Sequence, residues 1–249
     1  MGKGMNVNSH IDNGLRKNRL NIVKEQDLTE QFEDKLIDWC TFYRRNIHRF
    51  VEHYFGIRLH LYQKIMLYLM NLTPVAVLLC SRAVGKSFIT ALYACAVCVL
   101  YPNSKVVATA KRKKTVELLI KEKIEKELMN FSPNLRREIK KINTSNNNTE
   151  VIFYNGSSFT VSPANDDARG QRCTILIVDE FRQTNKEVID SVFSPMEIQR
   201  QTPYLMNPKY EHLREDPREL YLSSAYYKSH WMWQTVKDAI IGSYDGSSI

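Results

Sequence analysis

The octapeptide CSRAVGKS at residues 80–87 has the residue types and spacing that most clearly predict chemistry. It fits the phosphate-binding pattern G-x-x-x-x-G-K-[ST] except at its first position, where Cys80 replaces glycine. Backbone N–H groups at a helix N-terminus cradle phosphate oxygens, Lys86 would place a positive charge at the β- and γ-phosphates, and the Ser87 hydroxyl would ligate Mg²⁺. The sequence therefore predicts an ATP site made by Ser81, Arg82, Ala83, Val84, Gly85, Lys86 and Ser87.

Two adjacent carboxylates, Asp179 and Glu180, follow the apolar segment TILIV at residues 174–178. The carboxyl ends of strands in a parallel sheet converge on the ligand crevice, so we expect this pair to lie beside the phosphate loop. Asp179 would hold the Mg²⁺ shell through water, and Glu180 would polarise the attacking water as general base. A catalytic glutamate directly after the metal-binding aspartate indicates ATP hydrolysis that drives mechanical work.

Four side chains are candidates for specific contacts to the γ-phosphate or the adenine. Arg82 in the loop, or Arg169 supplied by a neighbouring subunit, would stabilise charge on the γ-phosphate. Each arginine also fits an ordinary salt bridge or surface position. Tyr62 would stack on adenine and Gln63 would bind its N6/N7 edge, although this pair equally fits the start of a helix.

Basic residues are concentrated in one part of the chain. The formal net charge is +8, with 35 Lys and Arg against 27 Asp and Glu, and most of the excess lies in residues 105–141. The segment 121–127 fits a solvated helix face with Glu–Lys pairs, whereas the densest cluster has no such acidic partners nearby. That cluster is predicted to contact the DNA backbone, and it consists of Lys111, Arg112, Lys113 and Lys114.

The elements that would position these residues alternate between strands and helices. Short apolar runs at 75–79, 106–109, 174–178 and 220–223 predict strands buried on both faces, with helices over 88–100 and 111–129 between them. Residues 151–154 and 158–161 flank an Asn-Gly pair, which predicts a hairpin. The fold class is therefore α/β, with a mostly parallel central sheet flanked by helices.

Before this core, one helix is predicted from residue 27 to about residue 54 and a second over 61–71. We divide the chain into a flexible arm (1–26), a helical segment that includes the adenine-binding region (27–73), an ATPase core (74–243) and the start of a linker (244–249). The five cysteines, including Cys95 and Cys98, are expected to be reduced core thiols. The spacing of His48, His53 and His60 does not fit a zinc site. Charges within residues 75–101 argue against a membrane span.

With these motifs together, the chain resembles the N-terminal ATPase domain of the large terminase subunit of tailed bacteriophages, the DNA-packaging motor. The resemblance runs from about residue 54 to 227. Its most specific motif is the Ser-Arg-x-x-Gly-Lys-Ser form of the loop. It implies a P-loop NTPase fold of the ASCE or RecA-like type, with a hairpin and an N-terminal helical extension. It also implies that Arg82 or Arg169 is the arginine finger. It further implies a coupling motif that responds to loss of the γ-phosphate, made by Ser223, Ser224 and Ala225.

The resemblance further implies partners and a location. These are double-stranded DNA bound without sequence preference, other copies of the chain in a ring, the portal protein and the small terminase subunit. The chain would act in the host bacterial cytoplasm, at the portal vertex of the procapsid, and not at a membrane. Only 26 residues follow Ser223, too few for the nuclease domain of full-length large terminases, so we expect no nuclease activity. Two alternatives stay open: a fragment of a superfamily-2-like helicase or translocase, and an ATP-dependent assembly scaffold without turnover.

Overall fold

The computed structural model describes residues 28, 31–32, 35–81, 83–144, 149–163, 171–198, 208 and 215–245. The predicted arm at 1–26, Arg82, Arg169 and the side chain of Lys113 lie outside the described residues. The chain divides into two compact units, Met1–Arg44 and Arg45–Ile249. In the first unit, residues 35–44 are helical.

The helix predicted from residue 27 to 54 is not continuous. It is interrupted at Asn46, whose φ of −124° and ψ of 58° lie outside the α region, and helix α2 (Ile47–His53) begins after it. Helix α3 (Leu61–Leu72) matches the second predicted helix closely.

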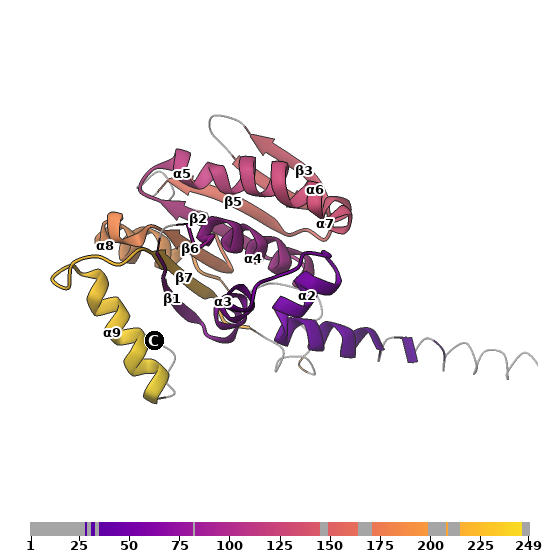
Figure 1. The fold of residues 1–249 in the computed structure, drawn as a ribbon, viewed down its shortest axis with the longest axis horizontal. Helices are drawn as coiled ribbons and strands as arrows, with labels where there is room; N and C mark the ends of the chain where they lie inside the picture. The colour runs from indigo at the N-terminus through magenta and orange to yellow at the C-terminus, as the bar shows by residue number, and fades with distance from the viewer. Residues whose placement is uncertain are drawn as a thin grey trace, which may run out of the picture. The chain divides into compact units, whose positions relative to one another are not determined.

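The second unit is built on one mixed sheet of seven strands in the order β1-β7-β6-β2-β5-β4-β3 (Figure 1). The pairs β1·β7, β7·β6, β6·β2 and β2·β5 are parallel. Strands β4 and β3 extend the sheet beyond β5 by antiparallel pairing. The strands are β1 (Val75–Leu79), β2 (Lys105–Ala110), β3 (Ile139–Thr144), β4 (Thr149–Phe153), β5 (Ser158–Pro163), β6 (Ile175–Asp179) and β7 (Arg218–Ser223).

The predicted α/β class is confirmed, with two differences. Strand β1 was expected to be buried on both faces, but it is the edge of the described sheet and only Ala76 in it is buried. The sequence pattern also gave no strand at β3, because its Lys-Lys-Ile-Asn stretch lacks a clean apolar alternation. The Asn155-Gly156 hairpin is confirmed between β4 and β5, and Gly156 has the positive φ (84°) that such turns require.

Helices pack on both sides of this sheet (Figure 1). Helix α4 packs against β2 and β5, and α9 packs against β1. The described helical segments from α4 to η5 connect the strands, with η1 as a π-helical continuation of α5, and α9 follows β7. Their bounds are α4 (Lys86–Leu100), α5 (Lys113–Leu118), η1 (Leu119–Leu128), α6 (Met129–Phe131), α7 (Pro133–Glu138), η3 (Phe181–Gln183), α8 (Lys186–Val188), η4 (Ile189–Phe193), η5 (Ser194–Met196) and α9 (Met232–Asp245).

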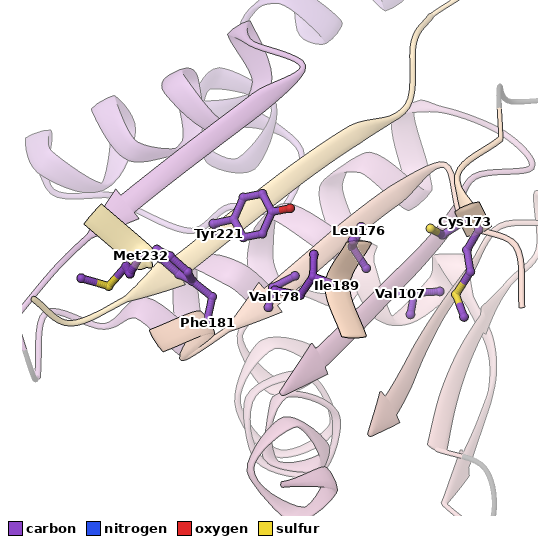
Figure 2. Close-up of a cluster of buried hydrophobic side chains, with 9 residues drawn as sticks. Val107, Cys173, Leu176, Val178, Phe181, Ile189, Tyr221 and Met232 are labelled. Atoms are coloured by element: carbon purple, nitrogen blue, oxygen red, sulfur yellow. The ribbon is translucent and has the colours of Figure 1, made fainter. Parts of the chain in front are cut away.

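One buried cluster joins the strands to the segment after β6 and to the start of α9 (Figure 2). Phe181 and Met232 are fully buried in it, beside Tyr221 of β7. Trp231 packs edge-on against Phe181, with ring centroids 5.7 Å apart. Cys95 and Cys98 are fully buried in α4, in agreement with their prediction as core thiols. No helix in the described part of the chain is long and apolar enough to cross a membrane.

Candidate active site

The phosphate-binding loop joins the carboxyl end of β1 to the N-terminus of α4. Cys80 N donates to the carbonyl of Ser223 at 2.9 Å, which fixes the start of the loop against the end of β7. Ala83 and Gly85 have positive φ values of 65° and 84°, so the chain reverses sharply before the helix. Helix geometry leaves the N–H groups of residues 86–88 without intrahelical acceptors, and these are the donors that a phosphate would accept from.

Lys86 lies inside the site rather than in solvent. Its side chain is 11% exposed, and Nζ lies 3.3 Å from Oε1 of Glu180 and 3.5 Å from the carbonyl oxygen of Cys80. Lys86 and Glu180 are 94 positions apart in sequence. The fold therefore brings together the two halves of the predicted site.

Asp179 and Glu180 differ in their surroundings although they are neighbours. Asp179 is the last residue of β6 and is 7% exposed, and burial, reinforced by the Glu180 carboxylate, raises its pKa to about 6. Its Oδ1 accepts the backbone N–H of Glu180 at 3.0 Å. Glu180 has left-handed backbone angles (φ 49°, ψ 45°), which are unfavourable for a residue with a long side chain. Strained backbone of this kind clusters at functional sites.

Arg182 is a site residue that the sequence analysis missed. Its Nε donates to Oε2 of Glu180 at 3.0 Å, and its side chain is 17% exposed. The two oxygens of Glu180 therefore each face one cation, Lys86 or Arg182. The only signal in the sequence was the position of Arg182 two residues after the predicted base.

Hydroxyl groups without partners gather where the parallel strands end. Thr109 and Ser223 are fully buried near the ends of β2 and β7, and within the described residues their Oγ atoms have no hydrogen-bond partner. The Oγ atom of Ser224 is also buried and has no hydrogen-bond partner among the described residues. Ser223 is paired in register with Leu79, the residue before the loop, so the predicted coupling motif begins directly beside the phosphate-binding loop. Ala225 is exposed and follows it.

The residues predicted to hold Mg²⁺ fit that ion chemically. Mg²⁺ is bound through one or two protein oxygens, with waters and substrate phosphates completing its shell. The buried carboxylate of Asp179 and the hydroxyl of Ser87 in the first turn of α4 supply such oxygens. The described residues contain no group of three or more His, Cys, Asp or Glu side chains that would make an all-protein cage.

The two residues predicted to bind adenine have different neighbours. The Tyr62 hydroxyl donates to the carbonyl of Val84 at 3.3 Å, so the Tyr62 side chain reaches the loop and remains 44% exposed. Gln63 Oε1 accepts the N–H of His60 at 2.9 Å and caps α3. Gln63 therefore fits the alternative interpretation of this pair as the start of a helix, and its contact with adenine stays a prediction.

The basic cluster begins where β2 ends. Lys111, Arg112 and Lys114 are exposed, and none of these three forms an ion pair with a described residue. In contrast, Lys121 pairs with Glu117 at 3.3 Å and Lys123 pairs with Glu127, as the Glu–Lys pattern predicted. Among the described residues, the positive charges of Lys111, Arg112 and Lys114 therefore have no acidic partner.

Comparisons with solved structures identify this architecture. No family model matches the sequence, and no curated protein matches it. The large terminase of bacteriophage HK97 is similar in structure, with a TM-score of 0.59, 17% identity and coverage of 80% of this chain. A point mutant of the ATPase domain of the Thermus phage P74-26 large terminase is also similar, with a TM-score of 0.56, 16% identity, and coverage of 76% of this chain and 74% of that one.

The chain has the fold of a phage large terminase ATPase domain. It spans 42% of the length of the HK97 large terminase. The predicted fold class, a mostly parallel central sheet flanked by helices, is thus confirmed.

Proposed function

We propose that this chain binds ATP and Mg²⁺ at the carboxyl edge of its sheet and hydrolyses ATP as the ATPase domain of a viral large terminase. The observation that carries this proposal is the 3.3 Å contact between Lys86 and Glu180. It unites a phosphate-binding loop with a strand-end carboxylate pair in a fold that phage terminase ATPase domains share. A loop without a neighbouring base would support nucleotide binding alone.

In the proposed reaction, the N–H groups of residues 86–88 and the Lys86 ammonium bind the phosphates. Lys86 leaves Glu180 as it does so, which frees Oε1 of the carboxylate. Glu180 then takes a proton from water while the water oxygen bonds to the γ-phosphorus and the bond to the β-phosphate oxygen breaks, giving ADP and phosphate. Arg82 or Arg169 would neutralise the developing charge, in cis or from a neighbouring copy.

Ser87 and Asp179 would hold Mg²⁺, which would neutralise phosphate charge when bound. Tyr62 would stack on the adenine and Gln63 would bind it. The exposed side chain of Tyr62 beside the loop supports this placement.

We further propose that hydrolysis drives double-stranded DNA into a procapsid. Ser223, Ser224 and Ala225 would pass the loss of γ-phosphate to a DNA-gripping surface, and Lys111, Arg112, Lys113 and Lys114 would contact the DNA backbone. Lys111, Arg112 and Lys114 are exposed and form no ion pair with a described residue, which supports a phosphate partner. The assembly would be a ring of copies with portal protein and small terminase subunit, in the host bacterial cytoplasm at the procapsid portal vertex.

Steady-state ATP hydrolysis against protein concentration, with Glu180→Gln as the blank and Glu187→Gln as a matched exposed control, tests the enzymatic part. Turnover that disappears in Glu180→Gln and persists in Glu187→Gln would support the proposal. Turnover that rises more than linearly with concentration would indicate a finger supplied in trans and point to Arg169, whereas linear turnover would point to Arg82. Tight ATP binding with no turnover above the blank would contradict the ATPase and favour an assembly scaffold.

DNA binding needs a separate assay. Binding of random-sequence duplex should weaken steeply with salt, and substituting Lys111 and Lys114 together by alanine should reduce the salt slope by about 2. Replacement of Lys121 and Lys123, which already pair with glutamates, is the matched control and should change the slope little. Equal slopes for the two double variants would contradict a role of the cluster in DNA binding.

A further inference from the structure

Arg182 lies between the proposed general base and the segment that leads from β7 to α9. On one side its Nε holds Oε2 of Glu180 at 3.0 Å. On the other side its guanidinium lies over the ring of Tyr226, with Cζ 5.4 Å from the ring centroid. This distance is within the range of a cation–π contact. Arg182 therefore contacts both the turn after β6 and the segment after β7, which follow two paired strands of the sheet.

The two cations on Glu180 are not equivalent. Lys86 belongs to the phosphate-binding loop, so phosphate competes with Glu180 for its ammonium. Arg182 follows β6 and is not part of that loop, so its bond to Oε2 can persist when Lys86 turns to the phosphates. The carboxylate then keeps one anchored oxygen, while the oxygen that Lys86 released faces the site.

The backbone around Glu180 is held as firmly as its side chain. Its left-handed conformation is fixed by Asp179 Oδ1 at its N–H and by the Gln183 N–H, which donates to its carbonyl at 2.8 Å. A strained residue persists only where its surroundings over-determine it. The Arg182 contact adds a constraint on the carboxylate itself, at the oxygen that Lys86 does not contact.

Tyr226 ties Arg182 to the beginning of α9. The carbonyl of Tyr226 accepts the indole N–H of Trp233 at 3.2 Å, and its ring packs edge-on against His230 at 5.2 Å. Phe181, the residue between Glu180 and Arg182, packs against Tyr221 and Trp231 (Figure 2 shows Phe181 beside Tyr221). Movement of this segment would therefore reach the Glu180 turn through two adjacent side chains.

We propose that Arg182 is a positioning residue that holds Oε2 of Glu180 and, through Tyr226, makes the orientation of Glu180 depend on the segment between β7 and α9. This inference rests on the proposed ATPase function. It assigns to the chain an internal connection between its proposed base and the elements that follow β7. Arg182 itself touches no phosphate in this scheme.

The test is the kinetics of ATP hydrolysis by the full chain with substitutions at both ends of the contact. Arg182→Gln should lower kcat by about tenfold to a hundredfold with KM for ATP unchanged, because a misplaced base loses rate and not substrate binding. Arg182→Lys should restore part of kcat, since an ammonium can still pair with Oε2. The matched control is Arg136→Gln, at an exposed position on α7, and it should leave both constants at parental values.

A double-mutant cycle tests the connection to Tyr226. Tyr226→Leu should lower kcat by less than Arg182→Gln does, and the double variant should be no slower than Arg182→Gln alone, because both changes break one chain of contacts. Tyr154→Leu, at another exposed tyrosine, is the control. Thermal unfolding of each variant separates lost positioning from lost folding.

The outcomes separate this inference from the proposed function. A parental kcat in Arg182→Gln, while Glu180→Gln is inactive, would overturn the positioning role and leave the ATPase intact. A loss of kcat in the double variant that equals the product of the two single losses would overturn the connection through Tyr226. A parental chain no faster than Glu180→Gln would overturn the ATPase and the inference with it.

Discussion

The two ends of strand β7 differ in whether their polar groups have partners. At the amino end, Arg218 is satisfied on several sides: Nη1 donates to Asn71 Oδ1 at 2.7 Å and to the Tyr93 hydroxyl at 3.4 Å, and the guanidinium lies over the ring of Tyr101. These contacts join α3, α4 and β7. This end of the strand is built for stability.

At the carboxyl end, five residues later, polar groups are in energetically unfavourable surroundings. Ser223 is fully buried with its hydroxyl unpartnered within the described residues, and the neighbouring strand ends in the buried carboxylate of Asp179 and the strained backbone of Glu180. A native protein retains such features where a ligand compensates for them or where they carry function. The contrast therefore supports the carboxyl edge as the candidate site without reference to any motif.

The largest expected effect is at the amino end. Arg218→Ala should reduce the free energy of unfolding by about 3 kcal/mol or more, because it removes hydrogen bonds to a charged group and opens a cavity between α3 and α4. Chemical denaturation monitored by tryptophan fluorescence measures this. Arg136→Ala, at an exposed position, should change the value by less than about 0.5 kcal/mol. Equal losses in the two variants would mean that Arg218 is not a structural anchor.

The next effect has the opposite sign. Asp179→Asn should stabilise the nucleotide-free protein in EDTA by up to about 3 kcal/mol at pH 8, since a rise in pKa of about two units costs that much when the carboxyl is ionised. Because the native pKa (about 6) is above the unfolded value (3.8), folding takes up a proton between them. The parent therefore gains stability as pH falls from about 6 to about 4, and the advantage of the variant shrinks. If the free energies of unfolding of the parent and of Asp179→Asn differ by the same amount at every pH in this range, the raised pKa of Asp179 is wrong.

The carboxyl end could be predicted from sequence more fully than the amino end. A phosphate-binding loop has a fixed spacing, and the Asp179-Glu180 pair follows an apolar run that predicts a buried strand. The alternation of such runs with helical segments then gave the fold class and the edge of the sheet at which these residues meet.

Contacts between distant residues could not be predicted in this way. Nothing in the sequence links Arg218 to Asn71, or Arg182 to Tyr226, because both pairs depend on how elements far apart in the chain come to lie together. The break at Asn46 and the edge position of β1 were missed for a related reason, since apolar periodicity indicates burial but not continuity or strand order.

A smaller effect would sharpen the account of the amino end. Tyr93→Phe should reduce the free energy of unfolding by about 1–2 kcal/mol, because the buried Tyr93 hydroxyl donates to the carbonyl of Met70 at 3.1 Å near the end of α3. That carbonyl has no helical donor, since Pro74 occupies the position whose N–H would reach it. Tyr154→Phe, at an exposed tyrosine, should be neutral in the same denaturation experiment.

The smallest effect on stability is expected at the carboxyl end. Ser223→Ala should change the free energy of unfolding by no more than about 0.5 kcal/mol, because the hydroxyl that it removes has no partner among the described residues. Ser104→Ala is the matched variant at the amino edge. Its hydroxyl is equally buried but donates to the Tyr101 carbonyl at 2.6 Å, so its loss should cost about 1 kcal/mol. If Ser223→Ala lowers ATP turnover while leaving unfolding unchanged, this buried hydroxyl serves the ligand and not the fold, whereas a loss of stability equal to that of Ser104→Ala would remove the contrast between the two edges.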